Sequence, residues 1–217
     1  MTTRRILAGL AAAALLTSGC LLKDVTETWY IAEDGAVTWV VIEKDVRSDA
    51  QAAVDRQNEE LGYYQAVQRE DHPAARGFRA LGAVKLRTRI LRSELPYTVV
   101  TEGRFTGLDV IGQRLIATTG LAGTSVIVRD GTTWEWTFTV RDPHAPDANV
   151  KVDEDVTSLM NDLDKLEAVL AVGRFESAHG FDLSSDKRKA TFDEDQLKDV
   201  DENSVVVLRL RWNTGKK

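Results

Sequence analysis

The sequence predicts an α+β protein in which an antiparallel sheet of β-hairpins alternates with helices packed on one face. Two observations predict this fold class. Segments with alternating apolar residues flank Asp34-Gly35 and Asp130-Gly131, which are strong hairpin signals. Apolar residues at helical spacing follow each of the first three predicted pairs, and a fourth unit is looser. The sequence therefore indicates a repeated β-β-α order.

The first unit is a hairpin followed by a helix. Residues 25–31 and 36–43 are rich in β-branched and aromatic side chains, and a two-residue turn between them would place Tyr30 opposite Trp39. Ser48 is expected to cap a helix that continues to about residue 68. The helix should end before His72-Pro73, because proline disfavours helical geometry in the residue before it.

The second unit pairs residues 84–92 with 97–105. In the first of these strands apolar residues alternate with basic ones, so one face should be buried and the other cationic. Thr106 is expected to cap a helix that stops near Gly120.

The third unit pairs residues 124–129 with 132–141, and its register is open. A two-residue turn puts Val128 opposite Thr133, whereas a three-residue loop brings Val128 beside Trp134 on the apolar face. The longer loop is favoured.

A predicted helix over 156–170 follows a polar loop, because apolar residues recur there at helical spacing. The looser fourth unit consists of a pair over 174–178 and 187–192, a short helix near 194–198 and a closing strand over 204–212.

The first twenty residues have the three-part order of a signal peptide. Arg4 and Arg5 precede an uncharged run from Ile6 to Leu16, which is short against the roughly 20 residues of a membrane-spanning helix. Small polar residues and Cys20 follow. We therefore divide the chain into a signal peptide over 1–19, a lipidated cysteine with a short tether over 20–24, and one globular α+β domain over 25–217.

Thr17-Ser18-Gly19-Cys20 resembles the lipobox of bacterial lipoprotein precursors. The resemblance covers only the leader, and the mature domain is assigned to no family. It implies cleavage before Cys20, a diacylglycerol thioether on its sulfur and acylation, commonly with palmitate, of the new amino group. In a cell with two membranes, Leu21 after the cysteine points to the outer membrane. The alternative is an ordinary secretory leader with an incidental cysteine.

Charge and cysteine content exclude several classes of protein. The chain of 217 residues carries 28 basic and 34 acidic side chains, and removal of the leader with its two arginines leaves a net charge of about −8. We expect no nucleic-acid partner for so acidic a body. Its single cysteine forms no intrachain disulfide and no cysteine-based zinc cluster.

The motifs of familiar enzymes are absent from the sequence. His72, His144 and His179 stand beside proline or glycine in predicted turns and lack metal-binding spacing, so we interpret them as turn histidines. Acidic runs at 153–155 and 193–202 are interpreted as helix caps and not as calcium loops. We assign no catalytic residue, metal ligand or cofactor.

Two groups of residues could form a binding surface. One sheet face could carry Lys85, Arg87, Arg89 and Arg104, with Arg209 and Arg211 as an extension, and hold an anionic polymer or lipid headgroups. The alternative is a solvated face partly neutralised by Glu102. The five tryptophans could line an apolar pocket, but aromatic residues at strand spacing usually build core, which is the interpretation adopted.

These observations predict an exported, lipid-anchored cell-envelope protein of a binding or scaffolding type. Its partners would be the membrane, through Cys20, and an anionic envelope polymer or a protein. The alternative is an envelope hydrolase whose site is assembled from dispersed histidine and acidic residues.

Overall fold

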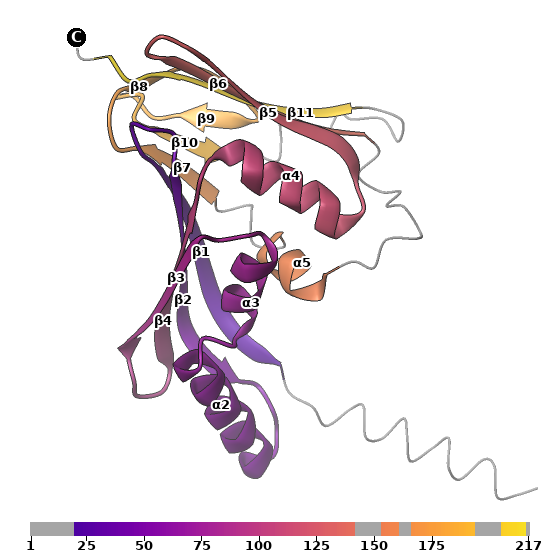
Figure 1. The fold of residues 1–217 in the computed structure, drawn as a ribbon. Coiled ribbons are helices and arrows are strands. Elements are labelled where there is room, and N and C mark those ends of the chain that lie inside the picture. Colours follow the sequence, from indigo (N-terminus) through magenta and orange to yellow (C-terminus); the bar gives the residue numbers. More distant parts are fainter. Residues whose placement is uncertain (1–19, 142–152, 161–165, 194–204, 216–217) are drawn as a thin grey trace, which may run out of the picture.

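The strands of the protein form two sheets, which the computed structural model describes over residues 20–141, 153–160, 166–193 and 205–215 (Figure 1). The mixed α+β class is confirmed, but two sheets replace the single predicted sheet. Their strand orders are β3-β4-β2-β1-β7-β10-β9 and β5-β6-β11-β8. The repeated β-β-α order is not confirmed as a structural repeat, because the first two hairpins join one sheet and the third joins the other.

The seven-stranded sheet contains β1 (Leu21–Ile31), β2 (Val37–Ser48), β3 (Lys85–Arg92), β4 (Tyr97–Phe105), β7 (Leu166–Leu170), β9 (Phe181–Leu183) and β10 (Lys189–Phe192). The four-stranded sheet contains β5 (Ala122–Asp130), β6 (Thr133–Arg141), β8 (Arg174–His179) and β11 (Val205–Asn213). β1 starts at Leu21, so residues 21–24, expected to be a tether, lie in a strand.

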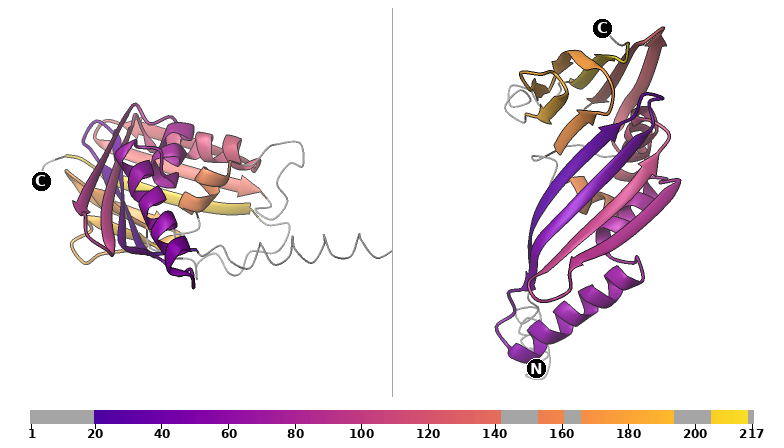
Figure 2. Two further views of the ribbon diagram at one scale, coloured as in Figure 1. Left: turned by 90° about the horizontal axis from the view of Figure 1, so that it is seen from below. Right: turned by 90° about the vertical axis from the view of Figure 1, so that its left-hand side faces the viewer.

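The helices lie on one side of the seven-stranded sheet and leave its other face bare (Figures 1 and 2). They are α2 (Ala53–Gln68), α3 (Pro73–Ala80), α4 (Leu108–Thr119) and α5 (Glu154–Met160). Helices α3, α4 and α5 occupy the angle between the two sheets, and α2 packs at the far end of the long sheet. In the described part of the chain, every helix is too short or too polar to cross a bilayer.

The first hairpin has a register that differs by one residue from the predicted one. Trp29, and not Tyr30, lies opposite Trp39. The loop runs over residues 32–36, five residues instead of two, and Gly35 in it has φ +84°. A side chain at Gly35 would come within 2.8 Å of Trp134, so this turn packs against the second sheet. Both tryptophans consequently lie on the buried face.

Tryptophans join the two sheets at the centre of the core. The ring of Trp29 lies edge-on to Trp39 of the same sheet at 5.5 Å and to Trp136 of the other sheet at 5.9 Å, measured between centroids. All five tryptophans are buried in one cluster, which confirms their interpretation as core. The two sheets therefore share one core, joined by direct contact between aromatic rings.

The helices near the N-terminus differ from prediction at their start. Ser48 belongs to β2, and α2 begins at Ala53 without a side-chain cap. The chain leaves α2 before His72, as predicted, but Pro73 then starts α3, which was not predicted. Proline is favourable at the first position of a helix, where its missing N–H is not needed.

The predictions for the middle of the chain were partly right. Helix α4 ends at Thr119 before Gly120, whose φ is +71°.

In the third hairpin neither predicted register occurs, because Val128 lies opposite Glu135 and Arg129 opposite Trp134. The Arg129 guanidinium stacks over the Trp134 ring at 4.5 Å. In this register the partner of Val128 on β6 is Glu135, two residues beyond the Thr133 that a two-residue Asp130-Gly131 turn would place there.

The helix predicted over 156–170 is wrong in its second half. Helix α5 ends at Met160, and Leu166–Leu170 forms β7, which pairs in parallel with β1. Burial alternates along this strand, with Leu166, Ala168 and Leu170 buried. An apolar segment of five residues is compatible with both the helical and the strand periodicity, so the sequence pattern does not distinguish them. The strands predicted at 174–178 and 187–192 exist but join different sheets. The short helix predicted near 194–198 lies outside the described residues.

Candidate functional site

The four basic residues singled out from the sequence lie together on the bare face of the seven-stranded sheet. Lys85, Arg87 and Arg89 alternate along β3 with Leu86 and two other residues that face the helices. Lys85 lies directly opposite Arg104 of β4. All four basic side chains are exposed. We call Lys85, Arg87, Arg89 and Arg104 the cationic face.

One carboxylate on this face partly neutralises the cationic face. Glu102 lies opposite Arg87 and forms an ion pair with Arg89. In the described part of the chain, Lys85, Arg87 and Arg104 form no ion pair. Alternate residues on a strand are about 6.6 Å apart and neighbouring strands about 4.8 Å apart. The arrangement thus presents a small grid of cations whose guanidinium groups suit phosphate or carboxylate oxygens.

The expected extension of this surface by Arg209 and Arg211 is wrong. Both residues lie on β11, in the four-stranded sheet. Arg211 forms ion pairs with Glu176 at 2.9 Å and Glu135 at 3.6 Å, and Arg209 pairs with Glu135 at 3.6 Å. They therefore form a local charge network in which neither cation stands alone.

Cys20 is exposed and directly precedes β1, at the end of the seven-stranded sheet where Ser48 of β2 is bonded to Glu59 and Glu60 of α2. Its backbone N–H donates to the Asp49 carboxylate, and its carbonyl accepts the Asp49 N–H at 3.1 Å. Leu21 is already paired with Ser48. Cys20 is thus fastened to the folded body by its own backbone.

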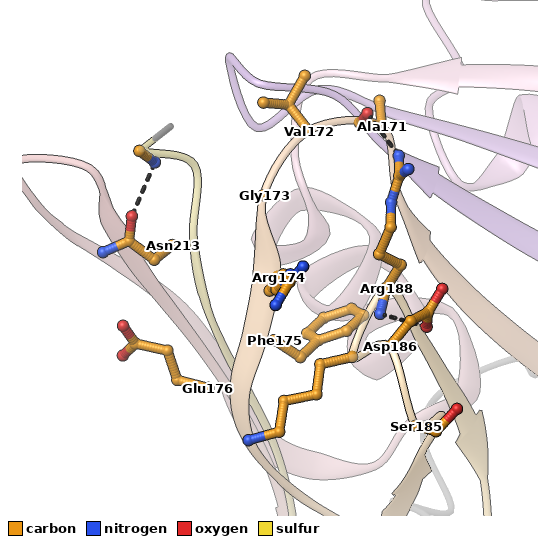
Figure 3. Close-up of a pocket in the computed structure, with 12 residues that line it drawn as sticks. Ala171, Val172, Gly173, Arg174, Phe175, Glu176, Ser185, Asp186, Arg188 and Asn213 are labelled. Carbon is orange, nitrogen blue, oxygen red and sulfur yellow. Dashed lines mark hydrogen bonds between the residues drawn. The ribbon is translucent and has the colours of Figure 1, made fainter. Parts of the chain in front are cut away.

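An open hollow of about 920 Å³ lies where the β7–β8 turn, the β9–β10 turn and the end of β11 meet (Figure 3). Basic side chains from Arg174, Lys187 and Arg188 line it beside acidic Glu176 and Asp186. Sequence reasoning missed this hollow, because its lining comes from three segments distant in the chain.

Most charges in the hollow have partners within the fold. Arg188 donates to the carbonyls of Leu170 and Ala171 at 3.3 and 3.0 Å. The Ser184 hydroxyl and the Arg188 N–H donate to Asp186, which lowers the pKa of that carboxyl. The hollow is therefore lined by turns whose charges are mostly bonded within the fold, and its lining is a mixture of polar and apolar atoms and not the mainly apolar wall of a typical small-molecule site.

A buried polar cluster under α2 and α3 was also missed. The Tyr63 hydroxyl donates to Glu43 Oε2 at 2.9 Å, and the Lys23 ammonium donates to Glu43 Oε1 at 2.6 Å. His72 Nε2 lies 2.8 Å from the Thr101 hydroxyl and 3.9 Å from Glu43. Burial and the Glu43 carboxylate raise the pKa of Tyr63, so its hydroxyl remains a proton donor. The cluster fastens the helices to the sheet.

The interpretation of His72 as a turn histidine is wrong in one respect. It precedes α3 in a turn, but its side chain is fully buried. Burial lowers its pKa below the ordinary value of 6.5. Its distance to Glu43 exceeds a hydrogen bond, and neither residue lines the hollow. His179 is exposed, and His144 lies outside the described residues. Nothing in this geometry supports the hydrolase alternative.

The acidic run at 153–155 caps a helix, as interpreted. Asp153 Oδ1 accepts the N–H groups of Asp155 and Val156 at the start of α5, and Asp155 receives two hydrogen bonds from Arg76. Only Asp193 of the second run is described. Over the ranges the structure covers, no three histidine, cysteine or acidic side chains gather as metal ligands.

One solved structure is similar to this chain. The chain is similar to the NMR structure of the folded domain of the LppM protein of Mycobacterium tuberculosis, with a TM-score of 0.38 and 9% identity. The match covers 89% of this chain and 91% of the other. No protein-family profile matches the sequence. No curated protein matches it either.

Proposed function

We propose that the chain is an exported protein, anchored by lipid on Cys20, that binds an anionic partner of the cell envelope and catalyses no reaction. The observation that carries the binding role is the cationic face, where four exposed cations share one carboxylate. The lipobox supports the anchor, and Cys20 is exposed at the start of the folded body. In a cell with two membranes, we expect the protein to be anchored in the outer membrane, because Leu21 follows the cysteine.

The charge distribution supports an anionic polymer as the partner. The mature chain is acidic overall, so a polyanion would be repelled by most of its surface. The cationic face is a local exception, and arginine binds phosphate and carboxylate groups in bidentate fashion. Binding should therefore occur at this face and weaken as salt is added.

Acylation is tested by feeding cells an alkyne-bearing fatty acid and examining the protein for label. Wild type should be labelled and Cys20→Ala should not. Equal labelling of the two proteins would refute the anchor.

Polymer binding is tested on immobilised polyphosphate and polygalacturonate, which separate phosphate from carboxylate recognition. Charge reversal at Arg87 and Arg89 should abolish retention on the preferred polymer, with only the small loss of stability expected from the exposed ion pair between Arg89 and Glu102. The matched control reverses Arg79 and Arg114, which are exposed on the helical side of the sheet and change the net charge equally. Equal retention of both double variants would show that the cationic face is only a solvated surface.

A further inference from the structure

Of the ten large apolar side chains that are exposed in the described part of the chain, five lie at the end of the molecule that carries Cys20. Turn residues 93–96 reach the level of Cys20, because Tyr97 pairs beside Val46, two residues before the partner of Leu21. The exposed large apolar residues at this end are Leu22 at 45%, Val54 at 68%, Leu61 at 49%, Leu91 at 62% and Leu95 at 47%. We call these five residues the docking end.

Helix α2 adds an uncharged surface to the docking end. Its exposed residues are Ala53, Val54, Gln57, Asn58, Leu61, Gly62, Gln65 and Gln68. Its charged side chains are turned toward the body, where Glu59 accepts a hydrogen bond from Ser48 and Arg56 donates to the Ala50 carbonyl. An uncharged face is notable in a chain with 29% charged residues. It can meet a polar-apolar boundary without desolvating an ion.

Side-chain contacts join the helix, the hairpin and the first strand at this end. The ring of Tyr64 of α2 lies tilted against the ring of Tyr97, with 5.3 Å between the centroids. Val46 and its neighbours are packed against by Leu21, Ile90 and Tyr97. The helix, the β3–β4 turn and the start of β1 therefore form one surface.

We propose that the docking end lies in the headgroup boundary of the bilayer that holds the acyl chains of Cys20. This inference rests on the proposed lipid anchor. Cys20 is tied to Asp49, so no linker separates the lipid from the body, and one extended residue reaches only about 3.5 Å. The body must then touch the bilayer at this end. Leucines and valines at such a boundary bury apolar area. The exposed face of α2 brings no carboxylate to anionic lipid, and the exposed charges elsewhere at this end are of both signs, with Arg47 and Arg92 as well as Asp49 and Glu94.

The test uses the mature acylated protein in vesicles of phosphatidylethanolamine and phosphatidylglycerol. The Cys20 sulfur is blocked in the thioether, so Leu95→Cys, Leu61→Cys or Val126→Cys each supplies a single free thiol for a fluorescent NBD label. Val126 is the matched control, exposed at 49% on the other sheet. Labels at 95 and 61 should be quenched by nitroxide phospholipids and be several-fold less sensitive to aqueous iodide than the label at 126. Adding Leu61→Glu should restore iodide quenching at position 95 while the lipid keeps the protein on the vesicle.

The outcomes separate this inference from the proposed function. If mass spectrometry finds no acyl groups on Cys20, both the proposed lipid anchor and the docking end are refuted. Acylated protein whose labels at 95 and 126 respond alike to iodide refutes only the docking end. Shielding from iodide without nitroxide quenching would indicate contact with a second copy, and also refutes it.

Discussion

Replacing Tyr63 by phenylalanine should remove the hydrogen bond that fastens α2 to the sheet while keeping the ring that packs there. The bond joins the Tyr63 hydroxyl to the Glu43 carboxylate over 2.9 Å, and both side chains are buried. A hydrogen bond to a charged group contributes about 1.5–3 kcal/mol to stability. Lys23 still pairs with Glu43 at 2.6 Å, so the carboxylate retains a partner. We expect a loss near 2 kcal/mol, or roughly 4–8 °C in the melting temperature.

Urea denaturation followed by tryptophan fluorescence and circular dichroism measures this loss. The matched control is Tyr64→Phe, because Tyr64 lies next in the helix and its hydroxyl has no hydrogen bond in the described part of the chain. The control should stay within about 0.5 kcal/mol of wild type. A double variant with Glu43→Gln should lose less than the sum of the single losses. Equal stability of the two tyrosine variants would refute the role given to Glu43.

Three further predictions concern buried groups. Because burial lowers the pKa of His72, the unfolded chain protonates this histidine at a higher pH than the folded chain does, and wild type loses stability as the pH falls. His72→Asn should therefore lose less stability than wild type between about pH 7.5 and 5.5. The same decrease in melting temperature with pH for both proteins would contradict this. Trp39→Phe removes the 2.8 Å hydrogen bond from Trp39 Nε1 to Glu27, whereas Trp212→Phe loses packing alone. The free energy of unfolding should therefore fall by about 1.5–3 kcal/mol more in Trp39→Phe than in Trp212→Phe. Equal losses in urea denaturation would refute this. Gly35→Ala should destabilise the chain by more than about 1 kcal/mol, because φ is +84° and Trp134 occupies the space; unchanged thermal melting would count against that contact.

The sequence predicts the elements of this fold better than it predicts their arrangement. Hairpins and the ends of α2 and α4 follow from turn residues and local periodicity. The expected cap at Thr106 is wrong, because Gly107 precedes α4 and no side chain caps it. The register of the first hairpin does not, because its loop has five residues and packs at Gly35 against Trp134, which is distant in the chain. The strand β7 is equally non-local, since its five residues become a strand only by pairing with β1.

The candidate site divides in the same way. Strand alternation alone places Lys85, Arg87 and Arg89 on one face, and the β3–β4 hairpin adds Arg104. The buried cluster around Glu43 leaves no sequence signal, because Tyr63 and Glu43 come from different elements and each looks like an ordinary surface residue. The hydrophobic pattern of α2 is similarly weak, and the structure alone reveals that its exposed face is uncharged.

The two proposed surfaces would work at different heights above the membrane. The row of Arg89 aligns across the sheet with Thr26 of β1, and the row of Lys85 aligns with Tyr30. With about 3.3 Å per residue along β1, these rows lie roughly 20 and 33 Å from Cys20. Both distances exceed the screening length of about 8 Å at physiological salt. The cationic face is thus too far from the headgroups of its own membrane to be neutralised by them, which favours a polymer or another molecule reaching in from the envelope. Retention on polyphosphate or polygalacturonate should accordingly be the same for acylated protein on vesicles and for Cys20→Ala protein in solution. Loss of binding on vesicles alone would show that the anchored body lies flat, with this face turned to the lipid.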